Sequence, residues 1–191
     1  MVRFVIAALG LALLAACASL GVPGGNQLRS IDYANDDVAS LLIAFDLPET
    51  IEPMAEGPAL NFEVKTAAGE SRTMRAVLAR ADAGELAGTL PPPGDGRVYY
   101  LFGFGEEDQA AIRDTQAWAK AQPQGQGTTL GIALEPRFCA TEAVDPAKVR
   151  YSVLLALPGT SGLAPLVKDQ PLSAALAASG ATLPLCEGHS G

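Results

Sequence analysis

Apolar residues recur at every second position in several short segments of this chain, and only one segment has the longer period of a helix. The clearest alternation runs from Val149 to Leu157, where every other residue is Val, Tyr or Leu. A period of two places successive side chains on opposite faces of a β-strand, so that one face can pack on a core. The pattern predicts a mainly β protein.

Further strands are expected at five places along the chain. Residues 38–46 are almost continuously apolar, which suits a strand buried on both faces. Residues 60–79 alternate on either side of a central turn and are expected to form a hairpin. Residues 98–104 hold the densest aromatic cluster and are expected to form a central strand. Alternation over 128–134 and a shorter run at 163–167 bring the expected total to six or seven strands.

The segment from Glu106 to Gln122 is expected to be an amphipathic helix, which Pro123 ends. At 100° per residue its inner face collects small and apolar residues, and its outer face collects polar ones. The inner face is expected to contain Ala111, Ile112, Thr115, Trp118 and Ala119, and the outer face Gln109, Arg113, Gln116 and Lys120.

The order of these elements favours one architecture over another. Strands dominate and most connections have hairpin length, so we expect a single-domain β-sandwich, immunoglobulin-like, with the helix inserted between strands four and five. An α+β two-layer sandwich is the alternative. A second helix of one or two turns is expected to begin with Pro171 at its first position.

The N-terminal segment has the features of an export signal. Arg3 supplies a positive charge, residues 4–16 are apolar or small, and a cysteine follows. The sequence Leu14-Ala15-Ala16-Cys17 resembles the lipobox of bacterial lipoproteins. The resemblance implies removal of residues 1–16, lipidation of Cys17 and attachment to the periplasmic face of a membrane. Ala18 after the cysteine favours the outer membrane over the inner one.

The remaining chain divides simply. Residues 17–30 are small and Gly-rich and are expected to form a flexible tether behind the lipid. Residues 31–187 are expected to form the globular β-rich domain, and residues 188–191 a short tail. The 175 residues left after cleavage suffice for one domain with a substantial core.

The charge of the mature chain limits its partners. Without residues 1–16 the net charge is about −9, which opposes binding to nucleic acid or anionic headgroups. Membrane contact is therefore expected through the N-terminal lipid alone. Acids concentrate in residues 30–64 and bases in residues 65–80. We expect these charges to pair across neighbouring strands, and a docking surface for a basic protein partner is the alternative.

Two cysteines remain if Cys17 carries lipid. In an oxidising periplasm Cys139 and Cys186 are expected to form a disulfide. A metal site is disfavoured because two thiols without a nearby histidine supply too few ligands. Two buried free thiols are the alternative.

The sequence assembles no catalytic set. His189, the only histidine, lies in the Gly/Ser-rich tail, and Ser161 lacks the G-x-S-x-G pattern of a nucleophile elbow. Residues 103–108 have an aspartate where a dinucleotide fingerprint needs its third glycine. The acidic cluster 32–37 lacks the order of a calcium-binding loop and is expected to be a solvated turn, with a calcium site as the alternative. No catalytic residue, metal or cofactor is expected.

Three aromatic residues are the candidates for ligand contact: Tyr99 and Tyr100 in the expected central strand, and Trp118 on the helix. The sequence favours a non-enzymatic, membrane-anchored protein that acts in protein contact or assembly at the cell envelope. A binding module for a small ligand, glycan or peptide is the second hypothesis. A hydrolase that uses two carboxylates is the third.

Overall fold

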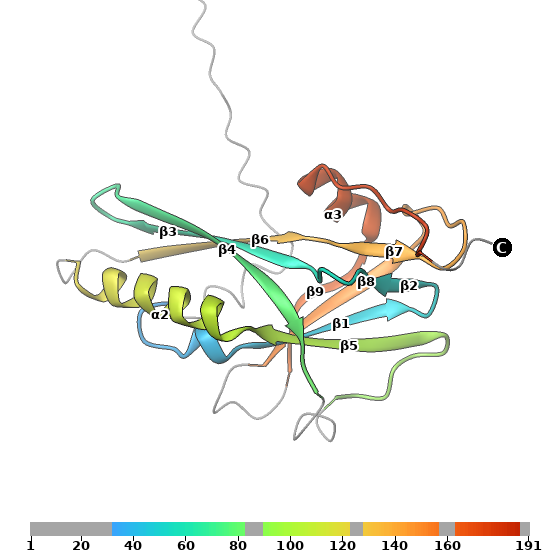
Figure 1. Ribbon diagram of the computed structural model, residues 1–191, viewed down its shortest axis with the longest axis horizontal. Helices are drawn as coiled ribbons and strands as arrows, with labels where there is room; N and C mark the ends of the chain where they lie inside the picture. The colour runs from blue at the N-terminus through green and yellow to red at the C-terminus, as the bar shows by residue number, and fades with distance from the viewer. Residues whose placement is uncertain (1–31, 83–89, 123–127, 157–162, 188–191) are drawn as a thin grey trace, which may run out of the picture.

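The computed structural model describes residues 32–82, 90–122, 128–156 and 163–187 (Figure 1). This part of the chain is mainly β, which confirms the predicted architecture of a β-sandwich with an inserted helix. The strands are β1 (Leu42–Pro48), β2 (Ile51–Pro53), β3 (Ala59–Thr66), β4 (Ser71–Arg80), β5 (Arg97–Phe104), β6 (Thr128–Glu135), β7 (Phe138–Ala140), β8 (Arg150–Ala156) and β9 (Ala164–Pro171). The helices are the 3₁₀ turn η1 (Val38–Ser40), α2 (Glu106–Lys120) and α3 (Leu172–Ser179).

Seven strands form one curled antiparallel sheet in the order β6-β3-β4-β5-β1-β8-β9. Strand β4 belongs to two layers, because residues 71–77 pair with β3 and residues 78–80 pair with β5. One layer therefore contains β6, β3 and the first part of β4, and the other contains β5, β1, β8 and β9 (Figure 1). Helix α2 follows the fourth strand of this sheet, as predicted.

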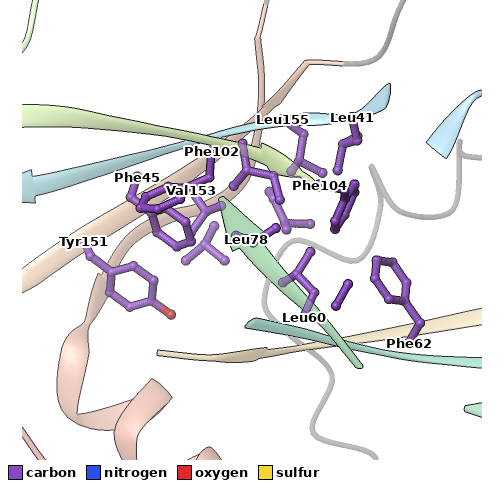
Figure 2. Packing of buried hydrophobic residues seen from close by; sticks show 14 of the residues in the cluster. Leu41, Phe45, Leu60, Phe62, Leu78, Phe102, Phe104, Tyr151, Val153 and Leu155 are labelled. Atoms are coloured by element: carbon purple, nitrogen blue, oxygen red, sulfur yellow. The ribbon is translucent and has the colours of Figure 1, made fainter. Parts of the chain in front are cut away.

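The core lies between the two layers (Figure 2). In β3 the buried side chains of Leu60, Phe62 and Val64 alternate with more exposed neighbours, as the period of two predicts. The ring of Phe62 lies 5.9 Å from that of Phe104 on β5, a contact that joins the two layers. The facing layer contributes Ile43, Phe45, Phe102, Val153 and Leu155.

Several predicted boundaries move. The run 38–46 is not one strand, because its first residues form the turn η1 and pairing begins only at Leu42. The predicted strand at 163–167 is longer and extends to Pro171, with an irregularity near Asp169, whose φ of 49° is positive. Pro171 precedes α3 as its N-terminal flanking residue instead of occupying its first turn.

A second, two-stranded sheet pairs β2 with β7, and neither strand was predicted. Both have three residues, which is too short for a period to be visible. The predicted disulfide between Cys139 and Cys186 is confirmed, and it attaches the C-terminal segment to β7. Backbone hydrogen bonds from Ala140 to Pro184 and from Cys186 to Ala140 reinforce this attachment. The chain after α3 is therefore held at the end of the sandwich.

The expected pairing of acids in 30–64 with bases in 65–80 across neighbouring strands is wrong for the described residues. The one ion pair of that set within them joins Lys65 to Glu63, and both belong to β3. Arg72 reaches Asp114 on α2, and Arg75 reaches Glu135 on β6. The predicted pairs were between residues close in sequence. The fold instead brings bases of β4 close to acids of α2 and β6, which are distant in sequence.

The helix α2 packs against η1, β4 and β5, and its buried face differs from the predicted one. Gln116 was assigned to the solvent face but is buried, whereas Ala111 is exposed. The Gln116 amide nitrogen donates hydrogen bonds to the carbonyl oxygens of Tyr33 and Asp36, at 2.6 and 2.7 Å. The segment before η1 covers this side of the helix. The Gln116 side chain is therefore buried and joins α2 to that segment.

Replacing Gln116 with Met should therefore destabilise the protein while preserving side-chain volume. The change leaves the buried Tyr33 carbonyl without its donor, whereas the Asp36 carbonyl keeps the bond from the Val38 amide, and we expect the free energy of unfolding to fall by about 1–3 kcal/mol. Chemical denaturation measures this loss. The control is Arg113→Met on the exposed side of the same helix, which should change stability by less than about 0.5 kcal/mol. Equal effects of the two substitutions would show that the Gln116 link contributes nothing.

Candidate functional site

A cavity of about 440 Å³ lies between the two layers, where β6 and β9 form the ends of the sheet. Its walls come from β1, β3, β6, β8, β9 and α3. The apolar lining residues are Ile43, Phe45, Leu60, Ile132, Ala133, Leu134, Val153, Leu155, Leu166, Val167, Ala174, Ala175 and Ala178. The polar ones are Asn61, Glu135, Tyr151, Gln170 and Ser179. Its volume lies in the range of roughly 300–1,000 Å³ typical of small-molecule pockets.

Small side chains on α3 leave this volume open. The helix presents Ala174, Ala175 and Ala178 to the cavity, where larger residues would fill it. On the opposite wall, Ile132 and Leu134 of β6 remain only partly buried although they point toward the core. The helix α3 is held at both ends. Strand β9 directly precedes it, and the segment that follows it is attached to β7 by the disulfide between Cys186 and Cys139.

Tyr151 contributes the most deeply buried polar group of the lining. Its side chain is 6% exposed, and its ring lies beside Phe45 and Val153 with the hydroxyl directed toward the facing layer (Figure 2). Burial raises the pKa of this hydroxyl above its ordinary value, so it remains protonated and able to donate. Within the described residues, no hydrogen bond involves the Tyr151 hydroxyl, although it lines the cavity.

Glu135 is the only acid of the lining, and its carboxylate accepts hydrogen bonds from two arginines. The Arg75 guanidinium donates from two nitrogens, at 2.8 and 3.0 Å, to the two carboxylate oxygens, and Arg137 donates to one of them at 3.0 Å. The hydrogen bond from Arg75, opposed by burial and reinforced by Arg137, lowers the pKa of Glu135 to about 2. The carboxylate is therefore ionised at neutral pH and already paired.

Two other polar lining residues also have partners within the protein. The Gln170 amide donates to the Lys168 carbonyl oxygen, and the Ser179 hydroxyl donates to the Ala175 carbonyl oxygen. A ligand with many hydroxyl groups would lose hydration here and find few partners. The chemistry of the lining therefore suits an apolar molecule with very few polar atoms.

The structure does not bring Tyr99, Tyr100 and Trp118 together, and none of them lines the cavity. Tyr99 and Tyr100 are consecutive in β5 and so point to opposite faces. Tyr100 packs on the core with the Arg80 guanidinium 4.5 Å from its ring centre. Trp118 is half-buried, with Arg72 at 4.7 Å. Both arginines occupy ring faces that a stacking ligand would need.

The other singled-out residues form no site in the described part of the chain. Asp32 and Asp36 accept hydrogen bonds within their own turn, from Ala34, Asn35 and the Asp32 amide. Among the described residues no group of three His, Cys, Asp or Glu side chains is arranged to hold a metal. Cys17, Ser161 and His189 lie outside the described residues. No helix within them is long and apolar enough to span a membrane.

Tyr151, Glu135 and the alanines of α3 are not among the site residues predicted from the sequence. Tyr151 carries the only hydroxyl on the inner face of the most regular strand pattern, and this was the one available signal. Comparison of the chain with protein-family models, curated proteins and solved structures gives no match.

The paired carboxylate of Glu135 predicts a specific acid sensitivity. Its pKa is about 2 in the folded protein, below the ordinary value of 4.5, so its contribution to stability is complete above about pH 4.5 and is lost as pH falls toward 2. Thermal unfolding between pH 6 and pH 2.5 should show a smaller loss of stability for Glu135→Gln than for the unmodified protein. Glu63→Gln, at a half-buried acid of β3 that pairs with the exposed Lys65, should behave as the unmodified protein does. Parallel pH profiles for all three would contradict this assignment.

Proposed function

We propose that this protein is a membrane-anchored lipoprotein of the cell envelope whose sandwich binds an apolar small molecule between its two layers. The observation that carries the proposal is the 440 Å³ cavity with its apolar lining. Binding requires no catalytic group, in agreement with the expectation of a non-enzymatic protein. For this reason we favour the binding module, the second hypothesis from the sequence, over protein contact or assembly.

The apolar surface of the cavity supports a ligand. The cavity is partly open to solvent, because Ala174, Ala178 and Ser179 of α3 are exposed, so its apolar walls are in reach of water when no ligand is bound. An apolar ligand would restore dispersion contacts along the walls and remove apolar surface from water. Part of the protein's stability would then depend on occupancy.

The lining also ranks the alternatives within the binding hypothesis. A glycan needs several unpaired donors and acceptors, whereas Glu135, Gln170 and Ser179 are already bonded. A hydrolase needs two carboxylates across a cleft, and the lining has one. Protein contact at the envelope remains a prediction from the sequence. The residues that line this cavity give no support to it.

The membrane anchor is part of the proposal and rests on Leu14-Ala15-Ala16-Cys17. An apolar ligand is poorly soluble in water and concentrates in membranes. A domain held at the periplasmic face of a membrane by a lipid on Cys17 would meet such ligands at their source. The outer membrane is the expected location.

The cavity can be tested by filling it. The full chain with Cys17→Ala, which would carry no acyl group, can be titrated without detergent with N-phenyl-1-naphthylamine, a neutral dye that fluoresces in apolar surroundings. Adding Ala175→Phe places a ring in the cavity and should weaken dye binding by at least about tenfold. Ala178→Phe, an exposed position of the same lining, should act in the same direction.

The matched control is Ala177→Phe, an exposed residue of the same helix that does not line the cavity. It should leave the dye affinity within about twofold of the parent chain, while circular dichroism verifies that every variant is folded. Equal dye binding by the Ala175 and Ala177 variants would refute a binding site in this cavity.

The anchor is tested by the Cys17→Ala substitution alone. The unmodified precursor should be cleaved before Cys17 and should yield an acylated N-terminal peptide by mass spectrometry. The substituted protein should lack acyl chains and leave the membrane fraction. Unchanged membrane partitioning of the substituted protein would show that the lipobox resemblance misidentifies the anchor.

A further inference from the structure

The Tyr151 hydroxyl is buried in an apolar wall, and within the described residues it has no hydrogen-bond partner. The other deeply buried tyrosine, Tyr33, differs in this respect, because its hydroxyl donates to the Ile112 carbonyl oxygen at 3.5 Å. A buried hydroxyl without a partner costs about 1–3 kcal/mol relative to one that is bonded. A phenylalanine would fill the same space without this cost. The hydroxyl is therefore a donor available to an acceptor that enters the cavity.

The position of Tyr151 indicates where in the cavity that partner lies. Tyr151 pairs with Gln170 across β8 and β9, so the two side chains share the inner face. Gln170 is only half-buried, and it lines the cavity together with Tyr151. Two polar side chains of neighbouring strands, Tyr151 and Gln170, are thus next to each other in a lining that is otherwise largely aliphatic.

The charges near the cavity limit the chemistry of the ligand's polar group. Glu135, the only acid of the lining, is held by both Arg75 and Arg137, and these three side chains together carry one net positive charge. A cationic ligand would find no unpaired carboxylate in the lining. The net positive charge of this cluster favours a neutral or anionic oxygen-bearing group over a cation, and such a group can accept a hydrogen bond from Tyr151.

We propose that the cavity binds a single-chain fatty acid, with the hydrocarbon chain between the layers beneath α3 and a carboxyl oxygen accepting a hydrogen bond from the Tyr151 hydroxyl. This inference rests on the proposed function and specifies its ligand class. It makes Tyr151 a specificity-determining residue that distinguishes an oxygen-terminated chain from a purely apolar molecule.

The test uses displacement of N-phenyl-1-naphthylamine by dodecanoic acid from the full chain carrying Cys17→Ala. Adding Tyr151→Phe removes one oxygen atom and keeps the ring, and displacement from this variant is expressed relative to its own measured dye affinity. Dodecanoic acid should displace the dye about five- to tenfold less effectively, the loss expected for one hydrogen bond. Dodecylamine, which has the same chain and a cationic end, should be a weaker competitor than the acid in the parent chain.

Tyr33→Phe is the matched control, because it removes a buried hydroxyl that does not line the cavity. It should leave both dye binding and displacement by dodecanoic acid unchanged. If the dye binds and the acid displaces it equally well from the parent and the Tyr151 variant, the hydroxyl does not contact the ligand oxygen and this inference is overturned. Displacement by the amine as effective as by the acid also overturns it. Failure of the dye to bind the parent chain instead overturns the proposed function.

Discussion

The transition of β4 from one layer to the other is the constraint on which the rest of this fold depends. At Val77 the strand still pairs with β3, and from Leu78 onward it pairs with β5. The Val77 amide, on the edge not yet covered by β5, donates to the Asp108 carboxylate in the first turn of α2 at 3.1 Å. An otherwise unpaired backbone donor is thereby satisfied by the helix inserted next in the chain.

This single bend determines where the sandwich is open. Because one strand joins the layers on one side, the terminal strands β6 and β9 face each other on the opposite side without pairing in the described residues. Exposed strand edges invite association, and α3 lies across this one with contacts to both β6 and β9. The alanines of α3 cover the gap without filling it, and this is the origin of the cavity.

The elements that the sequence predicted are those whose signal is local. The period of two identified β3 and β8, the aromatic cluster identified β5, and the shift to a helical period identified α2. The pairing of Cys139 with Cys186 followed from a count of available thiols. These inferences need no knowledge of which strands become neighbours.

The candidate site depends on neighbours, and its prediction failed for that reason. Aromatic content drew attention to Tyr99, Tyr100 and Trp118, but arginines from β4 cover two of those rings. Gln116 has the spacing of a solvent-facing residue, and only the chain folded over α2 makes it a buried donor. The cavity is invisible in sequence because its walls come from five strands and a helix distributed over residues 43–179.

The proposed anchor and the proposed ligand site are related through chain length. Fourteen residues lie between Cys17 and the first described residue, Asp32, so even a fully extended chain spans at most about 50 Å. A domain tethered by a lipid on Cys17 would therefore remain within that distance of the membrane surface, where fatty acids are concentrated. With a strongly acidic chain, electrostatic attraction to anionic headgroups cannot supply this proximity. The lipid on Cys17 would then set the supply of ligand, and the hydroxyl of Tyr151 would set which of the membrane's apolar molecules is retained.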